Sequence, residues 1–242
     1  MSTPDPGAAA PRDLRIDRRA PVRRIELGSG TWVDLVEGFV RDPQGELDDV
    51  LATVPWAQAE VLRYDQYVPE QRLSAGLRAD TRPLLRQTDL HLQATYRQAF
   101  DGVAAILYRD GTDFQGLHSD REMRWLDDTL IAIMVLGERR PFVFRPRTDW
   151  TESLAHRDPA GAGPNDVVVH PGRGDLMVMG GRCQADWLHG VPACPTPEPR
   201  VSLTWRWARR TGRPDTSPTY YDGRRFSDAP RRPPTRTRRS AS

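Results

Sequence analysis

The sequence predicts an α+β fold with a sandwich-like or barrel-like β-core. Two helical patterns fall in the first part of the chain, and short apolar segments separated by turn residues fill residues 103–207. Helices followed by many short strands are typical of this fold class. A chain of 242 residues is long enough for one such domain with tails.

The first part of the chain is predicted to hold both helices. Apolar and polar residues alternate over residues 25–40, which predicts one or two opening strands. Apolar side chains recur at helical spacing over residues 44–54 and again over residues 83–100, so each segment is expected to be a helix. Between them, residues 61–68 are expected to form one strand.

The second part of the chain is predicted to be mostly strand. The polar residues 145–166, with their Gly-Ala-Gly-Pro run, are expected to form a loop. The expected strands are 103–108, the segment that bears His118, 129–136, 141–144, 167–170, 175–179, 186–191 and 200–207.

Charge divides the chain into three parts. Residues 1–24 carry a net charge of +3 and residues 207–242 carry +7, whereas residues 25–206 hold 19 arginines against 27 acids, a net charge of −8. We expect a basic, disordered arm over 1–24, one folded domain over 25–210 and a basic, disordered tail over 211–242. The acidic domain is unlike a broad phosphate-binding surface, so the tail is either a solvated extension or an arm that attracts nucleic acid.

Composition indicates a cytoplasmic protein with no membrane partner. The longest apolar run, Leu130–Leu136, is too short to span a bilayer, and the N-terminal residues lack the apolar core of a signal peptide. Two cysteines, Cys183 and Cys194, are too few for a disulfide framework, and their spacing with His189 matches no standard zinc finger. Free thiols in a reducing compartment are therefore expected, and we expect a monomer.

Three residues are candidates for a metal site. His118 and Asp120 lie two residues apart, and on a strand such residues point to one face. A second imidazole from a distant strand, His189, would complete two histidines and a carboxylate, the set that binds iron in non-heme oxygenases. The other candidates for the third position are His91, His156 and His170.

The segment 200–207 presents a polar strand face with an arginine at each end. Its alternation places Arg200, Ser202, Thr204 and Arg206 on one face, opposite an apolar face of valine, leucine and tryptophan. Buried arginines need carboxylate partners, and the planar guanidinium suits bidentate carboxylate binding. A small dicarboxylic acid fits this face; the alternative is a pair of arginines in salt bridges at the exposed ends of a strand.

Four segments together resemble the AlkB family of 2-oxoglutarate- and Fe(II)-dependent dioxygenases. They are Tyr108–Asp120, Phe142–Arg145, Trp187–Pro192 and Pro199–Arg206, and their order and spacing match over roughly residues 60–210. The resemblance implies a double-stranded β-helix, or jelly roll, with flanking N-terminal helices and a nucleotide-recognition lid. It also implies Fe(II), 2-oxoglutarate and O2 as cofactor and co-substrates.

The activity implied by the resemblance is oxidative dealkylation of N-alkylated bases in DNA or RNA, which releases succinate, CO2 and an aldehyde. Alkylated DNA or RNA would be the partner, and the target base would have to be flipped out or single-stranded to reach a buried iron. Two alternatives remain open: a 2-oxoglutarate-dependent hydroxylase of a protein or small molecule, and a non-catalytic module that binds nucleic acid.

The resemblance also implies roles for single residues. His118, Asp120 and His189 would ligate iron; Arg200, helped by Tyr108, would pair with the distal carboxylate of 2-oxoglutarate. The remaining co-substrate candidates are Arg206, at the metal-chelating end, with Ser202 and Thr204, and the candidate contacts to the target base are Glu122, Tyr64 and Tyr67. The family commonly has asparagine where this chain has Ile106 and Ser202, so its co-substrate contacts are expected to differ.

Overall fold

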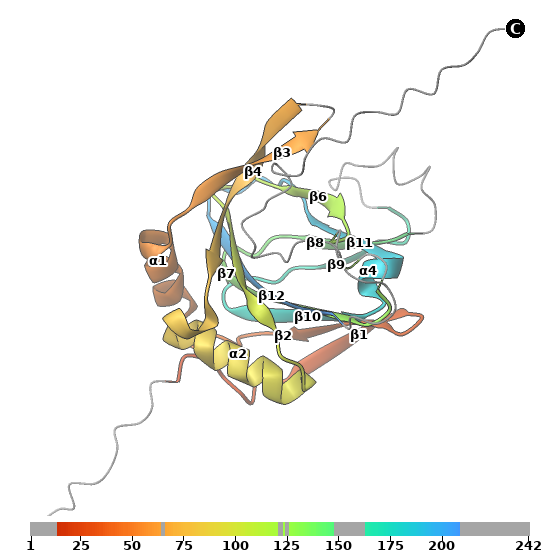
Figure 1. Cartoon of the computed structure of the whole chain (residues 1–242), viewed down its shortest axis with the longest axis horizontal. Helices are drawn as coiled ribbons and strands as arrows, with labels where there is room; N and C mark the ends of the chain where they lie inside the picture. The colour runs from red at the N-terminus through yellow and green to blue at the C-terminus, as the bar shows by residue number, and fades with distance from the viewer. Residues whose placement is uncertain (1–13, 64–65, 121–122, 124–125, 148–162, 209–242) are drawn as a thin grey trace, which may run out of the picture.

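Two antiparallel sheets form the body of the protein, with two helices outside the larger one (Figure 1). The computed structural model describes residues 14–63, 66–120, 123, 126–147 and 163–208. No helix in these residues is both long enough and apolar enough to cross a membrane.

The larger sheet has eight strands in the order β1-β2-β10-β7-β12-β5-β4-β3. Its strands are β1 (Val22–Gly28), β2 (Thr31–Val36), β3 (Ala57–Arg63), β4 (Gln66–Leu77), β5 (Asp101–Tyr108), β7 (Thr129–Gly137), β10 (Asp175–Gly181) and β12 (Arg200–Ala208). Strand β12 lies between β7 and β5 and is paired on both edges, which makes it an interior strand.

The smaller sheet has four strands in the order β6-β11-β8-β9. They are β6 (Gln115–His118), β8 (Phe142–Pro146), β9 (Val167–Val169) and β11 (Trp187–Val191). Its members come from well-separated parts of the chain, which is typical of a jelly roll, where the chain passes repeatedly between two sheets. The predicted jelly-roll core is therefore confirmed.

Helix ends follow local sequence rules. Helix α1 (Pro43–Thr53) starts with proline after Asp42, whose carboxylate accepts a hydrogen bond from the N–H of Gly45 at 3.0 Å. Helix α2 (Pro83–Tyr96) ends at Arg97, whose φ of 55° is left-handed. The two shorter helices are η1 (Ala79–Thr81) and α4 (Cys183–Asp186).

Each face of the larger sheet covers a separate apolar core. Side chains alternate along a strand, so β7 and β10 contribute buried apolar side chains to both cores, whereas those of β12 lie in the core under the helices. The core under the helices includes Val201, Leu203 and Trp205 of β12 with Leu84, Leu85 and Leu92 of α2. The core between the sheets includes Ile131, Ile133 and Val135 of β7 with Phe142, Phe144 and Val191 of the smaller sheet.

Some element boundaries differ from those predicted. The single strand expected over 61–68 was wrong: β3 ends at Arg63 and β4 begins at Gln66, and the two strands pair antiparallel as a hairpin. The helix expected to reach residue 100 ends at Tyr96, because Arg97 leaves the helical region. At the N-terminus, β1 already begins at Val22, ahead of the predicted boundary at residue 25.

The β3–β4 hairpin forms one edge of the larger sheet and projects beyond its other strands in Figure 1. It is joined to the segment before β6 by a hydrogen bond from Phe114 N–H to the Gln71 carbonyl at 3.3 Å. The hairpin therefore lies next to the chain segment that leads to His118.

Leu203 should stabilise the packing of β12 against the helices, since its side chain is 0% exposed in the core under them. We expect Leu203→Ala to lower the free energy of unfolding by about 2–5 kcal/mol, through lost burial and a residual cavity. Urea denaturation followed by circular dichroism measures this change. Leu90→Ala, at a position 51% exposed on α2, is the control and should change stability by less than ~0.5 kcal/mol; equal losses in both variants would contradict the assignment of the core.

Candidate metal and co-substrate site

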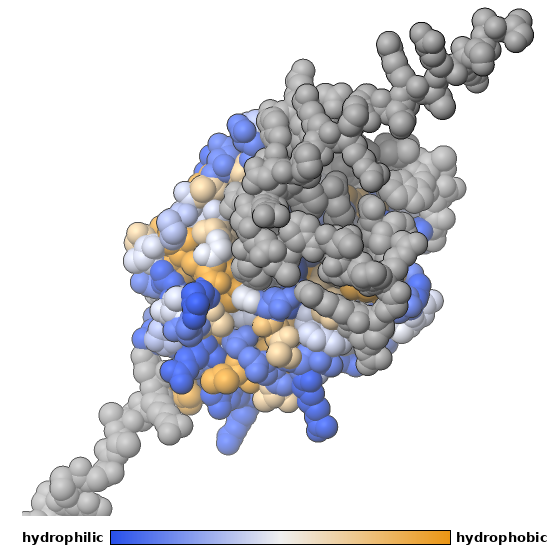
Figure 2. All heavy atoms as spheres, in the orientation of Figure 1, coloured by the Kyte–Doolittle hydropathy of each residue, from blue (hydrophilic) through white to orange (hydrophobic). Residues whose placement is uncertain are grey.

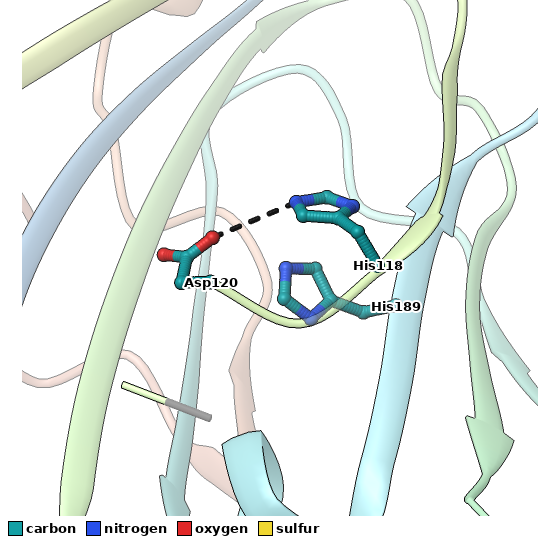
Figure 3. A group of neighbouring side chains, drawn as sticks. All are labelled: His118, Asp120 and His189. Atoms are coloured by element: carbon teal, nitrogen blue, oxygen red, sulfur yellow. Dashed lines mark ion pairs between the residues drawn. The ribbon is translucent and has the colours of Figure 1, made fainter. Parts of the chain in front are cut away.

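Two histidines meet across adjacent strands of the smaller sheet. His118 ends β6, His189 lies in β11, and the two are Cα partners in the antiparallel ladder. Directly opposed residues place their side chains on the same face of a sheet. Their rings accordingly lie together, with centroids 4.4 Å apart (Figure 3).

Asp120 joins the pair from the segment after β6, not from the strand itself. The prediction that His118 and Asp120 share a strand face was wrong in this respect, because β6 ends at His118. Asp120 lies two residues beyond the last residue of β6, and its carboxylate still reaches the His118 imidazole. Asp120 Oδ1 lies 3.6 Å from His118 Nε2 (Figure 3).

Neighbouring side chains hold the three residues in place. Buried Gln184 of α4 accepts a hydrogen bond from the main-chain N–H of Asp120 at 2.8 Å. The ring of Phe142 stacks on that of His189, with centroids 5.8 Å apart and planes 6° from parallel. On the other side of its ring, His118 Nδ1 lies 2.9 Å from the Gly116 carbonyl oxygen and 3.1 Å from the Gln115 amide nitrogen, so these groups hold the ring in place and leave Nε2 facing Asp120.

Electrostatics set the protonation states that a metal requires. Burial lowers the pKa of His189 to about 3, and the nearby His118 adds to the effect, so the His189 ring is neutral at physiological pH. Burial opposes ionisation of Asp120, but Arg206 and the two histidines outweigh it and hold the pKa of this carboxyl well below its usual range. Neutral imidazole and ionised carboxylate are the forms that bind metals.

The donor set fits one iron ion. One ligand atom from each of His118, Asp120 and His189 lies within 4.8 Å of the others, and no other group of this kind occurs in the described part of the chain. Two imidazoles and one carboxylate are the protein ligands of non-heme Fe(II) oxygenases, in which the remaining positions serve O2 and a co-substrate.

The polar face of β12 looks into the same space between the sheets. Val201, Leu203 and Trp205 point to the helices, so the alternate residues point the opposite way, towards the smaller sheet. At one end of this row, the Arg206 guanidinium donates through Nε to Asp120 Oδ2 at 2.7 Å. The carboxylate of the candidate metal site and the arginine row are therefore in direct contact.

Arg200 lies at the other end of the row and is 0% exposed. Its Nη1 donates to the Pro171 carbonyl at 3.0 Å, whereas Nε and Nη2 make no hydrogen bond to any described residue. Tyr108, its Cα partner on β5, is also buried. Burial lowers the pKa of Arg200 to about 10, so the guanidinium remains charged at neutral pH. A buried cation with two N–H groups left over fits an incoming carboxylate.

The other predicted site residues fall in several places. Ser202 and Thr204 are buried in β12 between the two arginines. Tyr67 lies in β4 as the backbone partner of Leu62, while Tyr64 and Glu122 lie outside the described residues.

The competing metal ligands do not join the group. His91 contacts Phe39 from α2, His170 is exposed after β9, and His156 lies outside the described residues. Cys183 and Cys194 are free thiols, as expected, and burial raises the pKa of Cys183 to about 12, which disfavours the thiolate that zinc would need.

Three residues around the site were missed by the sequence analysis: Gln184, Phe142 and Arg140. Gln184 and Arg140 are both 0% exposed, and a fully buried amide or guanidinium is unusual. Nothing in their local sequence marks them, because their partners are main-chain groups far along the chain.

Comparison with known proteins places the chain in a family. The family model described as the 2OG-Fe(II) oxygenase superfamily matches residues 51–227. The alpha-ketoglutarate-dependent dioxygenase alkB homolog 3 of Mus musculus is 29% identical over 222 residues, covering 82% of this chain and 74% of that protein. The DNA oxidative demethylase ALKBH2 of Homo sapiens is 32% identical over 129 residues, covering 51% of this chain and 46% of that protein.

Solved structures agree at the level of the fold. HygX from Streptomyces hygroscopicus, determined with nickel and 2-oxoglutarate bound, superposes with a TM-score of 0.52 at 12% identity, covering 74% of this chain and 83% of that chain. A prolyl hydroxylase from Trichoplax adhaerens, in complex with a peptide of the hypoxia inducible factor, gives 0.51 at 11% identity, with 73% and 83% covered. The chain belongs to the 2OG-Fe(II) oxygenase superfamily and is an AlkB-family dioxygenase that uses Fe(II), 2-oxoglutarate and O2.

Proposed function

We propose that this enzyme removes alkyl groups oxidatively from N-alkylated bases of DNA or RNA, releasing succinate, CO2 and an aldehyde. The observation that carries the proposal is the match to a DNA oxidative demethylase, ALKBH2 of Homo sapiens, over 51% of this chain. The match to alkB homolog 3, which is an alpha-ketoglutarate-dependent dioxygenase, covers 82% of this chain and supports the same type of reaction.

His118, Asp120 and His189 would hold the iron. Their donor atoms are grouped, and the ionised carboxylate and the neutral His189 are ready to bind without losing a proton first. Arg206 would keep Asp120 ionised and fix one of its oxygens, which leaves the other oxygen on the histidine side. Gln184 would position the main chain of the same residue.

Arg200 would bind the distal carboxylate of 2-oxoglutarate. Its two remaining N–H groups suit a carboxylate, and the buried Tyr108 lies beside it on the neighbouring strand. Ser202 and Thr204 would line the path between this end and Asp120. Bound Fe(II), with 2-oxoglutarate and O2, supplies the oxidation of the N-alkyl carbon, which then leaves as an aldehyde.

The alkylated base would enter beside the β3–β4 hairpin, the candidate for the nucleotide-recognition lid. This hairpin is bonded to the segment before His118 through Phe114 and Gln71. Tyr67 on the hairpin, with Tyr64 and Glu122, remains a candidate contact to the base. Because the iron ligands lie between two sheets, the base would have to leave its stack to reach them.

An alternative is hydroxylation of a protein side chain or small molecule. The net charge of −8 over residues 25–206 favours this alternative, since an acidic domain repels phosphates. A non-catalytic binding module is the other alternative, although the grouped metal donors and the buried arginines of β12 argue against it. A cytoplasmic location and a monomeric state stay predictions.

Turnover of methylated oligonucleotides tests the proposed substrate. We expect formaldehyde and succinate in equal amounts from single strands that contain 1-methyladenine or 3-methylcytosine, and no formaldehyde from the same strands without the methyl group. Mass spectrometry of the oligonucleotide should show loss of one methyl group. If the strands bind while 2-oxoglutarate is left unconsumed, the enzyme acts on another substrate or is a binding module.

Alanine at each proposed iron ligand should remove metal binding. His118→Ala, Asp120→Ala and His189→Ala are each expected to weaken Mn(II) binding, measured by electron paramagnetic resonance, and to abolish succinate production. Thermal denaturation should show that each variant is folded. His170→Ala serves as the matched control, because this histidine is exposed and outside the group; full turnover in any of the three ligand variants would contradict the iron site.

Arg200→Met should raise the Michaelis constant for 2-oxoglutarate strongly. Loss of one partner from a buried charge pair costs about 2–5 kcal/mol, which corresponds to at least ~30-fold in this constant. Arg200→Lys should recover only part of the loss, because an ammonium group lacks the planar fork. An unchanged Michaelis constant in Arg200→Met would show that the distal carboxylate binds elsewhere.

A further inference from the structure

Arg140 is a second fully buried arginine near the proposed co-substrate site. It lies in the connection between β7 and β8, and its side chain is 0% exposed. Neither the predicted iron ligands nor the polar row of β12 includes it. Burial of a guanidinium away from water is costly, so its surroundings must account for it.

The guanidinium binds main-chain carbonyls of two loops. Nη1 donates to Asp110 O at 3.1 Å, and Nη2 donates to Asp113 O at 2.8 Å and to Pro192 O at 2.6 Å. The first two carbonyls come after β5, the strand of Tyr108, and the third comes after β11, the strand of His189. Arg140 therefore ties together the ends of two strands that carry site residues.

No carboxylate of the described residues neutralises Arg140. The carboxylate of Asp113 is engaged by Arg109, at 2.8 Å, and only its carbonyl contacts Arg140. Carbonyl groups carry partial charge, so three of them leave most of a unit positive charge unmatched. Nε of Arg140 makes no hydrogen bond within the described part of the chain.

This uncompensated charge lies next to the Arg200 end of the row. The Arg140 guanidinium carbon is 5.2 Å from the centroid of the Tyr108 ring, and Tyr108 is the Cα partner of Arg200. Burial is the main reason for the lowered pKa of Arg200, and repulsion from the nearby Arg140 adds to it. Tyr108 and the buried Asp175 offset part of these effects on Arg200. Two buried cations near one tyrosine would nevertheless attract an incoming anion.

We propose that Arg140 is a positioning residue for the co-substrate, which places Tyr108 and supplies a second buried positive charge that selects 2-oxo acids with a distal carboxylate. The inference rests on the proposed 2-oxoglutarate site at Arg200. Selection arises because a ligand that ends in a methyl group would leave both cations unmatched, whereas a carboxylate would be attracted by both.

Binding of two co-substrates of equal chain length tests the proposal. The affinities of the Mn(II)-loaded protein for 2-oxoglutarate and for 2-oxopentanoate, which lacks the distal carboxylate, are measured by calorimetry. Arg140→Met should lower the affinity for 2-oxoglutarate by about tenfold or more, the effect of removing a nearby charge in a partly shielded site, while the affinity for 2-oxopentanoate changes little. The ratio of the two affinities therefore falls.

A purely structural role for Arg140 would lower the melting temperature and leave this ratio unchanged, and that result would overturn the proposal. If Arg140→Met fails to fold, Arg140→Lys is the test. Because lysine keeps the charge, this variant should keep the ratio of the affinities for 2-oxoglutarate and 2-oxopentanoate. A folded lysine variant in which this ratio falls would contradict the proposed role of the charge. Arg173→Met removes an arginine that is 71% exposed, and it is the control that should leave the ratio intact. Arg200→Met, measured in parallel, separates the two proposals, because a normal ratio there would reject the co-substrate site itself.

Discussion

The site depends on one constraint, the position of β12 in the middle of the larger sheet. Its two edges are paired with β5 and β7, and its apolar face is held in the core under the helices. These contacts fix the orientation of the strand, so its polar face points into the space between the sheets. Arg200 and Arg206 lie on that face because the alternate residues, Leu203 and its apolar neighbours, are buried on the other face.

Strand β12 also carries two of the charged groups between the sheets, Arg200 and Arg206. Arg206 donates a hydrogen bond of 2.7 Å to Asp120, so one end of the row contacts the proposed iron ligand directly. The two ends of the row differ. At the Arg206 end the guanidinium has Asp120 as its partner, whereas at the other end Arg200 has donors that no described residue uses. One end of the site therefore holds a buried ion pair, and the other end holds a buried cation with donors to spare. This difference suits a co-substrate whose two ends differ chemically.

Periodic features of the chain were predictable from the sequence, whereas features that depend on distant contacts were not. The two faces of β12 could be predicted because polar and large apolar residues alternate along residues 200–207. His118 and Asp120 do converge, but Asp120 lies beyond the end of β6, which the two-residue spacing alone could not distinguish from a continued strand. The partners of Gln184 and Arg140 are main-chain groups 64 and up to 52 residues away, so no local pattern reports them.

The two departures from the AlkB pattern are neighbours in space. Ser202 and Ile106 are Cα partners across β12 and β5, so the chain differs from the family at opposed positions of one ladder. With a hydroxyl and an apolar side chain at this pair, the proposed recognition of the co-substrate would rest on the buried guanidiniums. The buried charge of Arg140 beside Tyr108 would add to that electrostatic attraction.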